Sequence, residues 1–184
     1  MIKIVLVFVV LHFFENAPSQ NKLQFDTSLF NNIQNAVGKA FLFSNSKSLT
    51  DEEYNGELIK GNFTLINFWF EACEPCIAEF GALNRIYNKY KKNKRIKLIS
   101  FTFESPGDAL KIAKKYSLDY PIICISKEKC YELNFNNGFP TNIVTDSSGK
   151  VAYITVGGPI DTIEVDKSFA NTLLKIEERI RNRL

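Results

Sequence analysis

Residues 67–80 read NFWFEACEPCIAEF and place Cys73 and Cys76 with two residues between them, the second of which is Pro75. The run FTLINFWF over residues 63–70 is almost continuously apolar and aromatic, which is typical of a strand covered on both faces. Apolar side chains then recur at helical spacing beyond Cys76. Proline is tolerated in a first helical turn, where its missing N–H would have no partner. The stretch therefore predicts a buried strand that leads through a short turn into a helix.

This arrangement predicts two unequal cysteines. Cys73 falls at the N-cap of the expected helix, beside backbone N–H groups without partners and the positive end of the helix dipole. A thiolate is stabilised there, which makes Cys73 the predicted exposed nucleophile. Cys76 lies one turn further in, as a sheltered partner that can close a disulfide with Cys73. The acidic Glu74 between them opposes thiolate formation and moderates the effect.

Metal and haem chemistry fit these cysteines poorly. A zinc site needs four ligands, and the remaining cysteines, Cys124 and Cys130, lack the spacing of a second C-x-x-C knuckle. The single histidine, His12, lies in the N-terminal apolar segment, which disfavours a copper carrier. Ile77 follows Cys76, which excludes a haem attachment motif. No metal or other cofactor is predicted, and a purely structural disulfide is the alternative to a redox pair.

Length and charge limit the remaining classes of function. The 184 residues suffice for one domain with a substantial core. The 23 basic and 20 acidic side chains nearly balance, at a net charge of +3, which argues against a nucleic-acid partner. The most basic run, at 89–95, is better explained as the solvated end of a helix, where lysines complement the dipole.

Residues 1–19 differ in composition from the rest of the chain. The stretch 2–14 is almost wholly apolar apart from Lys3 and His12, yet it is short for a bilayer span. Small residues follow it, so we expect a secretory signal peptide that is cleaved before Gln20. An uncleaved segment that tethers the protein to a membrane is the alternative, and the segment has no cysteine for lipid attachment. Export to the periplasm or another extracytoplasmic compartment allows disulfides to persist.

The remaining pattern is one of strands that alternate with helices, followed by a hairpin and a last helix that begins near Asp161. Residues 20–38 are rich in Asn and Gln and are predicted to be loosely ordered, ahead of one domain over residues 39–184. The order of elements predicts an α/β domain with a central mixed sheet flanked by helices. The expected elements are a short strand at 39–43, a polar loop at 44–61 with a helical turn over 50–58, strands at 96–103 and 121–125, a helix capped by Ser105, a helical turn at 127–133, and a hairpin of strands 142–145 and 151–156.

The segment NFWFEACEPCIAEF resembles the active-site segment of the thioredoxin superfamily, in particular of the extracytoplasmic TlpA/ResA-like thiol-disulfide oxidoreductases. The similarity extends over residues 39–183 and includes GFPT and DSSGKV further along the chain. It implies a thioredoxin-like fold with an N-terminal β-hairpin and a βα insert before the strand that follows a cis-proline. It also implies that Pro140 is this cis-proline and that Phe139, Pro140 and Thr141 shape the surface that binds an extended substrate.

Three positions refine the resemblance. Cytosolic thioredoxins carry a buried aspartate six residues before the first cysteine, whereas this chain has Asn67, which cannot exchange protons. ResA-like relatives have a glutamate three residues after the second cysteine, and Glu79 occupies that place. Glu79 lies one helical turn from Cys76, so we expect it to deprotonate the resolving thiol, with a solvated surface carboxylate as the alternative. Ala72 stands where many relatives have tryptophan, which trims the apolar rim beside Cys73.

Cys124 and Cys130 are expected at the end of a strand and in the helical turn that follows it. Three alternatives stay open for them: a structural disulfide, two buried free thiols, or a second redox relay. Whether they can bridge depends on how closely their Cα atoms approach.

The sequence thus predicts an exported thiol-disulfide oxidoreductase that reduces protein disulfides. Its expected partners are a disulfide-containing protein substrate and an upstream membrane thiol donor, with no nucleic acid or metal. Membrane contact is expected only through an uncleaved signal anchor. The alternatives are a non-catalytic binding module of the same fold and a thiol peroxidase, which would need an activating threonine and arginine around one cysteine.

Overall fold

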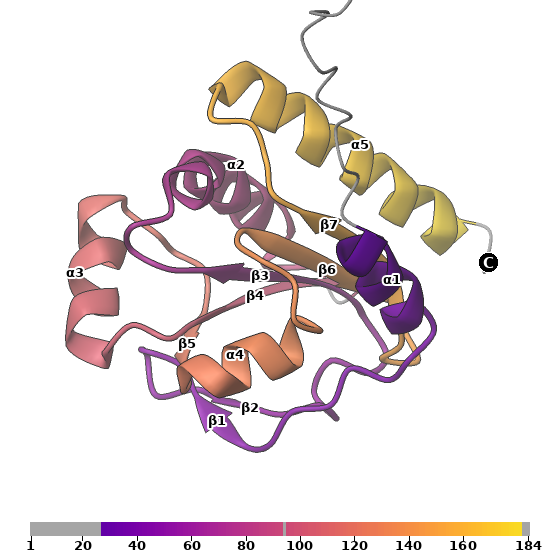
Figure 1. Cartoon of the computed structure of the whole chain (residues 1–184), viewed down its shortest axis with the longest axis horizontal. Coiled ribbons are helices and arrows are strands. Elements are labelled where there is room, and N and C mark those ends of the chain that lie inside the picture. Colours follow the sequence, from indigo (N-terminus) through magenta and orange to yellow (C-terminus); the bar gives the residue numbers. More distant parts are fainter. Residues whose placement is uncertain (1–26, 94, 182–184) are drawn as a thin grey trace, which may run out of the picture.

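A five-stranded mixed sheet in the order β5-β4-β3-β6-β7 forms the centre of the fold (Figure 1). The computed structural model describes residues 27–93 and 95–181. β3, β4 and β5 run parallel, whereas β6 pairs antiparallel with both β3 and β7. The carboxyl ends of the three parallel strands therefore meet at one edge of the sheet. The strands are β3 (Phe63–Trp69), β4 (Ile96–Thr102), β5 (Ile122–Cys124), β6 (Thr141–Thr145) and β7 (Val151–Val156).

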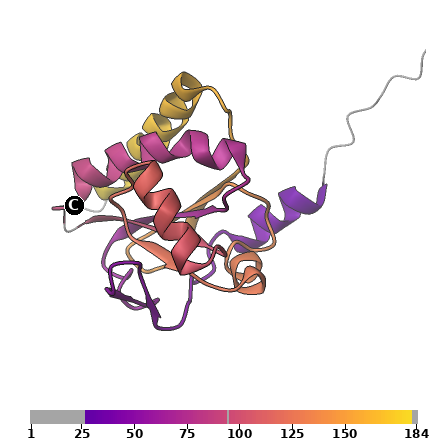
Figure 2. The same ribbon diagram turned by 90° about the vertical axis from the view of Figure 1, so that its left-hand side faces the viewer.

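Helices cover both faces of this sheet, as the two views in Figures 1 and 2 show. On one face, α2, α3 and α5 bury side chains in a core that includes Trp69, Phe80 and Phe169. On the other face, α4 and the end of α1 pack over a second core that includes Phe68 and Phe101. The helices are α1 (Thr27–Ala36), α2 (Glu74–Tyr90), α3 (Pro106–Lys115), α4 (Lys127–Leu133) and α5 (Thr162–Arg181). The thioredoxin-like α/β fold implied by the sequence is confirmed.

β3 is the central strand because it has neighbours on both edges and helices over both faces. All seven of its residues are buried, which confirms the prediction from its continuous apolar run. Two of its residues are polar, Thr64 and Asn67, and both are 0% exposed; Asn67 carries the side-chain amide. In the sheet register it lies opposite Asn142 of β6 and beside Ser100 of β4. Polar side chains from three neighbouring strands thus lie side by side in the middle of the sheet.

The helix that follows β4 begins as its sequence predicts. The Ser105 hydroxyl accepts a hydrogen bond from the Asp108 backbone N–H at 3.2 Å and donates to the Asp108 carboxylate at 2.7 Å. Pro106 occupies the first helical turn, where it loses no backbone bond. At α5, the Asp161 carboxylate accepts from the backbone N–H groups of Ile163 and Glu164. These caps fix where α3 and α5 start.

The N-terminal part of the domain corrects two local predictions. The strand expected at 39–43 is wrong: only Ala40 forms a bridge, to Lys150, because the backbone hydrogen bonds from this segment to the sheet are confined to Gly149 and Val151 at the start of β7. The helical turn expected over 50–58 is also wrong. Strands β1 (Ser46–Lys47) and β2 (Glu53–Tyr54) pair antiparallel there.

This pairing has a local cause. The Ser48 hydroxyl accepts from the backbone N–H groups of Thr50 and Glu52, and Asp51 adopts a positive φ of 62°. These contacts stabilise a tight turn rather than a helix. The N-terminal hairpin implied by the family resemblance is therefore confirmed.

The segment before the domain is more ordered than its composition suggests. Residues 20–38 are predicted to be loosely ordered, whereas α1 forms over Thr27–Ala36. Its end is fixed by packing, since Ala36 is 0% exposed in the second core. The predicted signal peptide at 1–19 and residues 20–26 lie outside the described part of the chain. Within the described residues, no helix is both long and apolar enough to cross a membrane.

Candidate active site

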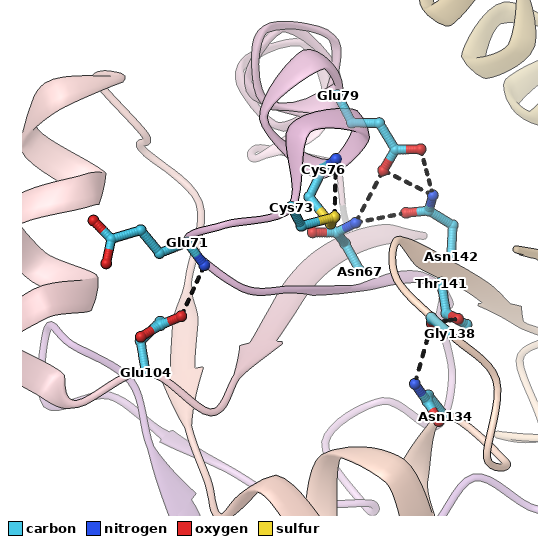
Figure 3. The surroundings of a disulfide bond; sticks show 10 residues. All are labelled: Asn67, Glu71, Cys73, Cys76, Glu79, Glu104, Asn134, Gly138, Thr141 and Asn142. Carbon is cyan, nitrogen blue, oxygen red and sulfur yellow. Dashed lines mark hydrogen bonds between the residues drawn. A yellow bond between two sulfur atoms is a disulfide. The ribbon is translucent and has the colours of Figure 1, made fainter. Parts of the chain in front are cut away.

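Cys73 and Cys76 form a disulfide at the start of α2, with their Cα atoms 5.2 Å apart (Figure 3). Cys73 is the N-cap residue of the helix, and its Sγ accepts a hydrogen bond from the Cys76 backbone N–H at 3.3 Å. The structure places Cys73 at 5% exposure and Cys76 at 0%. Closing the disulfide turns the Cys73 sulfur toward the helix, so Cys73 is only marginally accessible here. The expectation of an exposed Cys73 does not hold in this disulfide-bonded form.

Glu79 lies one turn further along α2 and is 4% exposed. A solvated surface carboxylate, the alternative considered from the sequence, is wrong. The Asn142 amide donates to both Glu79 oxygens at 3.0 Å, and the Asn67 amide donates to Oε2 at 3.2 Å. Burial raises the pKa of Glu79 to about 7, and the hydrogen bonds from Asn142 and Asn67 oppose that rise. Glu79 can therefore exchange a proton near neutral pH.

The two asparagines that hold Glu79 are neighbours across the β3–β6 pair. Asn67 Nδ2 also donates to Asn142 Oδ1 at 2.8 Å, so the two amides and the carboxylate form one hydrogen-bonded cluster (Figure 3). Among the described residues, Asn67 Oδ1 is buried without a partner. We call Asn67, Glu79 and Asn142 the carboxylate cluster. Sequence reasoning missed Asn142, because only the strand register brings it opposite Asn67.

The loop before β6 lies over the carboxylate cluster. The Phe139–Pro140 peptide bond is cis, as the resemblance implied, and the Pro140 carbonyl accepts from the Gly157 N–H at 2.8 Å. A Cβ at Gly158 would lie 3.2 Å from Glu79 Oε1 and 3.8 Å from Pro140 Cγ, so the backbone approaches both closely. Thr141 and Pro140 are buried, and the Thr141 hydroxyl donates to the Gly138 carbonyl. Phe139 is only half-buried, so it offers the accessible side chain of the three predicted substrate-binding residues.

Phe139 is one member of a cluster of half-buried aromatic rings that sequence reasoning did not find. Its ring centroid lies 5.4 Å from that of Phe70, 5.6 Å from that of Phe103 and 5.4 Å from that of Tyr131. Phe70 and Phe103 are stacked at 5.4 Å. We call Phe70, Phe103, Tyr131 and Phe139 the aromatic patch. Its first two members directly follow β3 and β4, so the patch lies at the same sheet edge as the disulfide.

Cys124 and Cys130 are free thiols in the structure. The structural disulfide that was one alternative is thus not formed here. Cys130 is 0% exposed within the second core, whereas Cys124 at the end of β5 is partly exposed. Burial raises the pKa of both thiols, that of Cys130 to about 12. Both thiols are therefore poor nucleophiles at neutral pH, unlike the cysteines that a redox relay needs.

The fold and the CxxC site at a helix start define a thioredoxin-like protein. The chain belongs to the AhpC/TSA family, whose model matches residues 37–154, more than half of the chain.

Named relatives agree with this assignment. The thiol-disulfide oxidoreductase ResA of Bacillus cereus is 30% identical over 100 residues, which cover 54% of this chain and 57% of that protein. The thioredoxin-like protein YneN of Bacillus subtilis is 28% identical over 113 residues, which cover 60% of this chain and 66% of that protein. The chain therefore matches between a little over half and about two thirds of the length of these curated relatives.

Solved structures support the fold. The thioredoxin domain of a thiol-disulfide oxidoreductase from Bacteroides vulgatus superposes with a TM-score of 0.61 at 20% identity, covering 74% of this chain and 97% of that one. A thiol-disulfide oxidoreductase from Bacteroides fragilis superposes with a TM-score of 0.57 at 21% identity, covering 70% and 98%. At these identities the likeness concerns the fold alone.

Proposed function

We propose that this protein is an exported thiol-disulfide oxidoreductase that reduces disulfides of protein substrates through its Cys73–Cys76 couple. The observation that carries the proposal is the joint placement of three groups on α2. Cys73 caps the helix, Cys76 is bonded to it, and the buried Glu79 lies one turn further along. The similarity to proteins named thiol-disulfide oxidoreductase supports the same reaction class.

In the first half-reaction, the Cys73 thiolate of the reduced protein attacks one sulfur of the substrate disulfide. A bond forms between Cys73 and that sulfur, the substrate S–S bond breaks, and the second substrate sulfur leaves as a thiolate that takes a proton from water. The N-terminus of α2 favours the Cys73 thiolate, because the N-cap sulfur already accepts the Cys76 backbone N–H. This step needs no base beyond the helix terminus.

In the second half-reaction, the Cys76 thiol loses its proton to Glu79, and its sulfur attacks the Cys73 sulfur of the mixed disulfide. The Cys73–Cys76 bond forms and the remaining substrate sulfur leaves, so that two electrons have passed from the dithiol to the substrate. A base whose pKa lies near neutrality suits this transfer, and burial gives Glu79 a pKa of about 7. The disulfide form must then be reduced again by an upstream thiol donor.

Insulin reduction with dithiothreitol as electron source tests the activity. We expect turnover by the protein and its loss in both Cys73→Ser and Cys76→Ser. If both serine variants keep the rate of the parent protein, the couple does not carry the reaction. The direction of electron flow is tested by the redox potential of the couple against glutathione, because a reductant needs a potential below that of the glutathione pool.

Glu79→Gln separates the two half-reactions. The substitution keeps size and removes the proton acceptor, and it replaces one of the two oxygens that accept from the Asn142 and Asn67 amides by an NH2 group. Stopped-flow kinetics between pH 5 and 9 should show slower resolution of a preformed mixed disulfide, with attack on a small disulfide nearly unchanged. Equal slowing of both steps, or of neither, would remove Glu79 from the role of base.

The two alternatives from the sequence have direct tests. A thiol peroxidase would consume hydrogen peroxide with dithiothreitol as the reductant. It would also need a threonine hydroxyl that activates the cysteine, whereas the Thr141 hydroxyl donates to the Gly138 carbonyl and the Thr102 hydroxyl accepts from the Glu104 backbone N–H. A binding module would keep the fold without an activated thiol, so iodoacetamide would label Cys73 with the pH dependence of an ordinary cysteine, whose pKa is about 8.5.

Export is a proposal that rests on the apolar segment at 2–14. Residues 1–24 fused to an alkaline phosphatase that lacks its own signal should yield phosphatase activity outside the cytoplasm of a bacterial host. Replacing two of the central apolar residues by lysine should abolish that activity. If the exported fusion keeps residues 1–19, the segment is a retained anchor; if it lacks them, the segment is a cleaved signal peptide.

A further inference from the structure

The aromatic patch lies where the polypeptide on either side of a substrate disulfide must pass. Phe70 is joined to the active-site turn, since its carbonyl accepts from the Cys73 backbone N–H at 3.2 Å. Phe139 directly precedes the buried Pro140, and its ring meets those of Phe70 and Phe103 edge-on. A disulfide that reaches Cys73 therefore brings its flanking residues over these half-buried rings. The patch is thus joined to the active-site turn through Phe70.

This patch supplies apolar contact that the active-site turn itself lacks. Ala72, the residue directly before Cys73, is exposed and carries only a methyl group. On the other side of Pro140 the surface is formed by Gly157 and Gly158, which have no side chain. The side of the disulfide that faces α4 is thus the one that offers rings. Aromatic rings that are already in place lose little conformational freedom when a partner packs on them.

Acidic side chains surround the same turn. Glu71 and Glu74 flank the disulfide and are exposed, and Glu104 Oε1 accepts the Glu71 backbone N–H at 2.7 Å (Figure 3). Two lysines also lie at this surface, one over a ring of the aromatic patch and one within electrostatic reach of Glu71. Lys127 Nζ stands 5.6 Å from the Phe103 ring centroid, and Lys111 Nζ pairs with Asp108 at 2.8 Å. The immediate surroundings of Cys73 are therefore acidic on a chain whose net charge is +3.

We propose that the aromatic patch and these acidic side chains form a docking surface for substrate segments that carry an aromatic residue and a basic residue next to the disulfide cysteine. The aromatic side chain packs against Phe103 and Phe139, and the basic side chain meets Glu71 and Glu104. The proposal rests on the proposed function, because it names the kind of disulfide substrate that the Cys73–Cys76 couple reduces.

Four synthetic peptide disulfides test the surface. They differ only in the two residues beside one cysteine: Phe-Lys, Ala-Lys, Phe-Glu and Ala-Glu. A small neutral disulfide, bis(2-hydroxyethyl) disulfide, reports the chemistry without flanking residues. For the pre-reduced protein we expect kcat/KM to rise about threefold to tenfold from Ala to Phe, as an aromatic contact gives. Lys in place of Glu should add a further gain that shrinks at high salt, because exposed charges are screened.

Two test variants and one control variant locate the effect. Phe103→Ala should remove the preference for Phe while leaving the rate with bis(2-hydroxyethyl) disulfide unchanged. Tyr153→Ala is the matched control, since Tyr153 is also a half-buried ring with a lysine over it, Lys175 Nζ at 4.3 Å, but it lies on β7 beside Val144 and away from the disulfide. Glu71→Lys tests the charge without disturbing packing, because Glu71 is exposed, and it should favour the Glu peptides over the Lys peptides.

The outcomes separate the docking surface from the reaction itself. If all four peptides react at one rate while the small disulfide is reduced normally, the docking surface is overturned and the proposed function stands. If Glu71→Lys leaves the Lys preference intact, or Tyr153→Ala abolishes the Phe preference as Phe103→Ala does, the docking surface is likewise overturned. Failure to reduce the small disulfide and the peptides alike overturns the proposed function, and the docking surface with it.

Discussion

The side-chain amide of Asn142 donates hydrogen bonds to both carboxylate oxygens of Glu79, each at 3.0 Å. Asn67 adds a third donor at 3.2 Å, and both asparagines are almost wholly buried. All three donors favour the ionised carboxylate, whereas burial favours the protonated form. Burial is the larger effect, and the pKa of Glu79 rises to about 7. The proton affinity of the site thus results from two opposed contributions that mutations can change separately.

The first prediction concerns stability and pH. Because the pKa of Glu79 rises from 4.5 to about 7 on folding, the folded protein binds more protons than the unfolded chain between these values. The free energy of unfolding should therefore fall as pH rises through this window, by roughly 3 kcal/mol from this group. Glu79→Gln lacks the titration. In guanidinium unfolding of the disulfide form, its stability relative to the parent should increase by that amount between pH 4 and 8.

Glu74→Gln serves as the control for this measurement, since Glu74 is exposed at the start of the same helix. The stability of Glu79→Gln relative to the parent should change with pH by more than that of this control. An equal change in the two variants would contradict the raised pKa of Glu79.

The second prediction concerns Asn142→Ala, which removes two donors from the ionised Glu79. A hydrogen bond to a charged group contributes roughly 1.5–3 kcal/mol, so losing them should raise the pKa of Glu79 by about one unit or more. The pH midpoint for resolving a mixed disulfide should move to higher pH by the same amount. Asn137→Ala is the matched control, because the buried Asn137 amide donates to the Asn134 carbonyl at 2.7 Å. It should lower stability and leave the midpoint where it is, and a shift in both variants would count against a specific role for Asn142.

The third prediction concerns the close approach of Gly158 to Glu79. An added methyl group at 3.2 Å from Glu79 Oε1 must displace the carboxylate or the loop. Gly158→Ala should therefore slow resolution severalfold and lower stability by about 1 kcal/mol, as overpacking does. Gly138→Ala is the control in the cis-proline loop before β6, where a Cβ has open space within 4 Å and the effect should be small. Stopped-flow measurement of mixed-disulfide resolution and thermal unfolding check both variants. Unchanged kinetics in Gly158→Ala would show that the segment after β7 moves away from Glu79 without affecting the reaction.

The fourth prediction orders the four thiols by reactivity. After reduction, limited alkylation at pH 7 followed by mass spectrometry should find Cys73 labelled first, since it has the helix N-terminus and the larger exposure of the pair. Cys124 should follow slowly, and Cys130 should react only on unfolding, because burial raises the pKa of both and Cys130 is inaccessible. Without reduction, Cys124 should be the cysteine that is labelled in the folded protein, with Cys130 following only on unfolding. Early labelling of Cys76 or Cys130 would reverse the assignment.

The sequence carries the parts of this site that depend on neighbours along the chain. The CEPC turn, the apolar run of β3 and the Ser105 cap are local patterns, and each predicts its element correctly. Glu79 is predicted from the family resemblance, and helical spacing places it one turn from Cys76. Asn142 lies 75 residues from Asn67, so only the β3–β6 register makes them partners. The aromatic patch was missed for the same reason, since its rings come from four separate segments.

The helical turn predicted over 50–58, where β1 and β2 form instead, is wrong for a different reason. Polar residues there satisfy both a helical turn and a tight β-turn, and the Ser48 hydroxyl decides between them through contacts that composition does not show. Local pattern therefore predicts elements well where apolar periodicity or a capping pattern is strong, and poorly in a polar stretch that has neither.

Because β6 pairs with β3, the carboxylate cluster beside the thiol pair is complete only when β6 has joined the sheet. A chain that ends before residue 141 still contains the CEPC turn and Glu79, but it lacks the strand that supplies Asn142. In such a chain we expect Glu79 to lose the Asn142 contacts and its burial against β6, so that Cys73 captures a partner that Cys76 releases slowly. We therefore expect nascent or truncated chains to accumulate as covalent adducts with other thiol proteins, whereas the completed domain sheds them. Non-reducing gels should show more covalent adducts for a chain that ends at residue 135 than for one that ends at residue 181. Equal amounts would show that completing the sheet does not govern release of the partner.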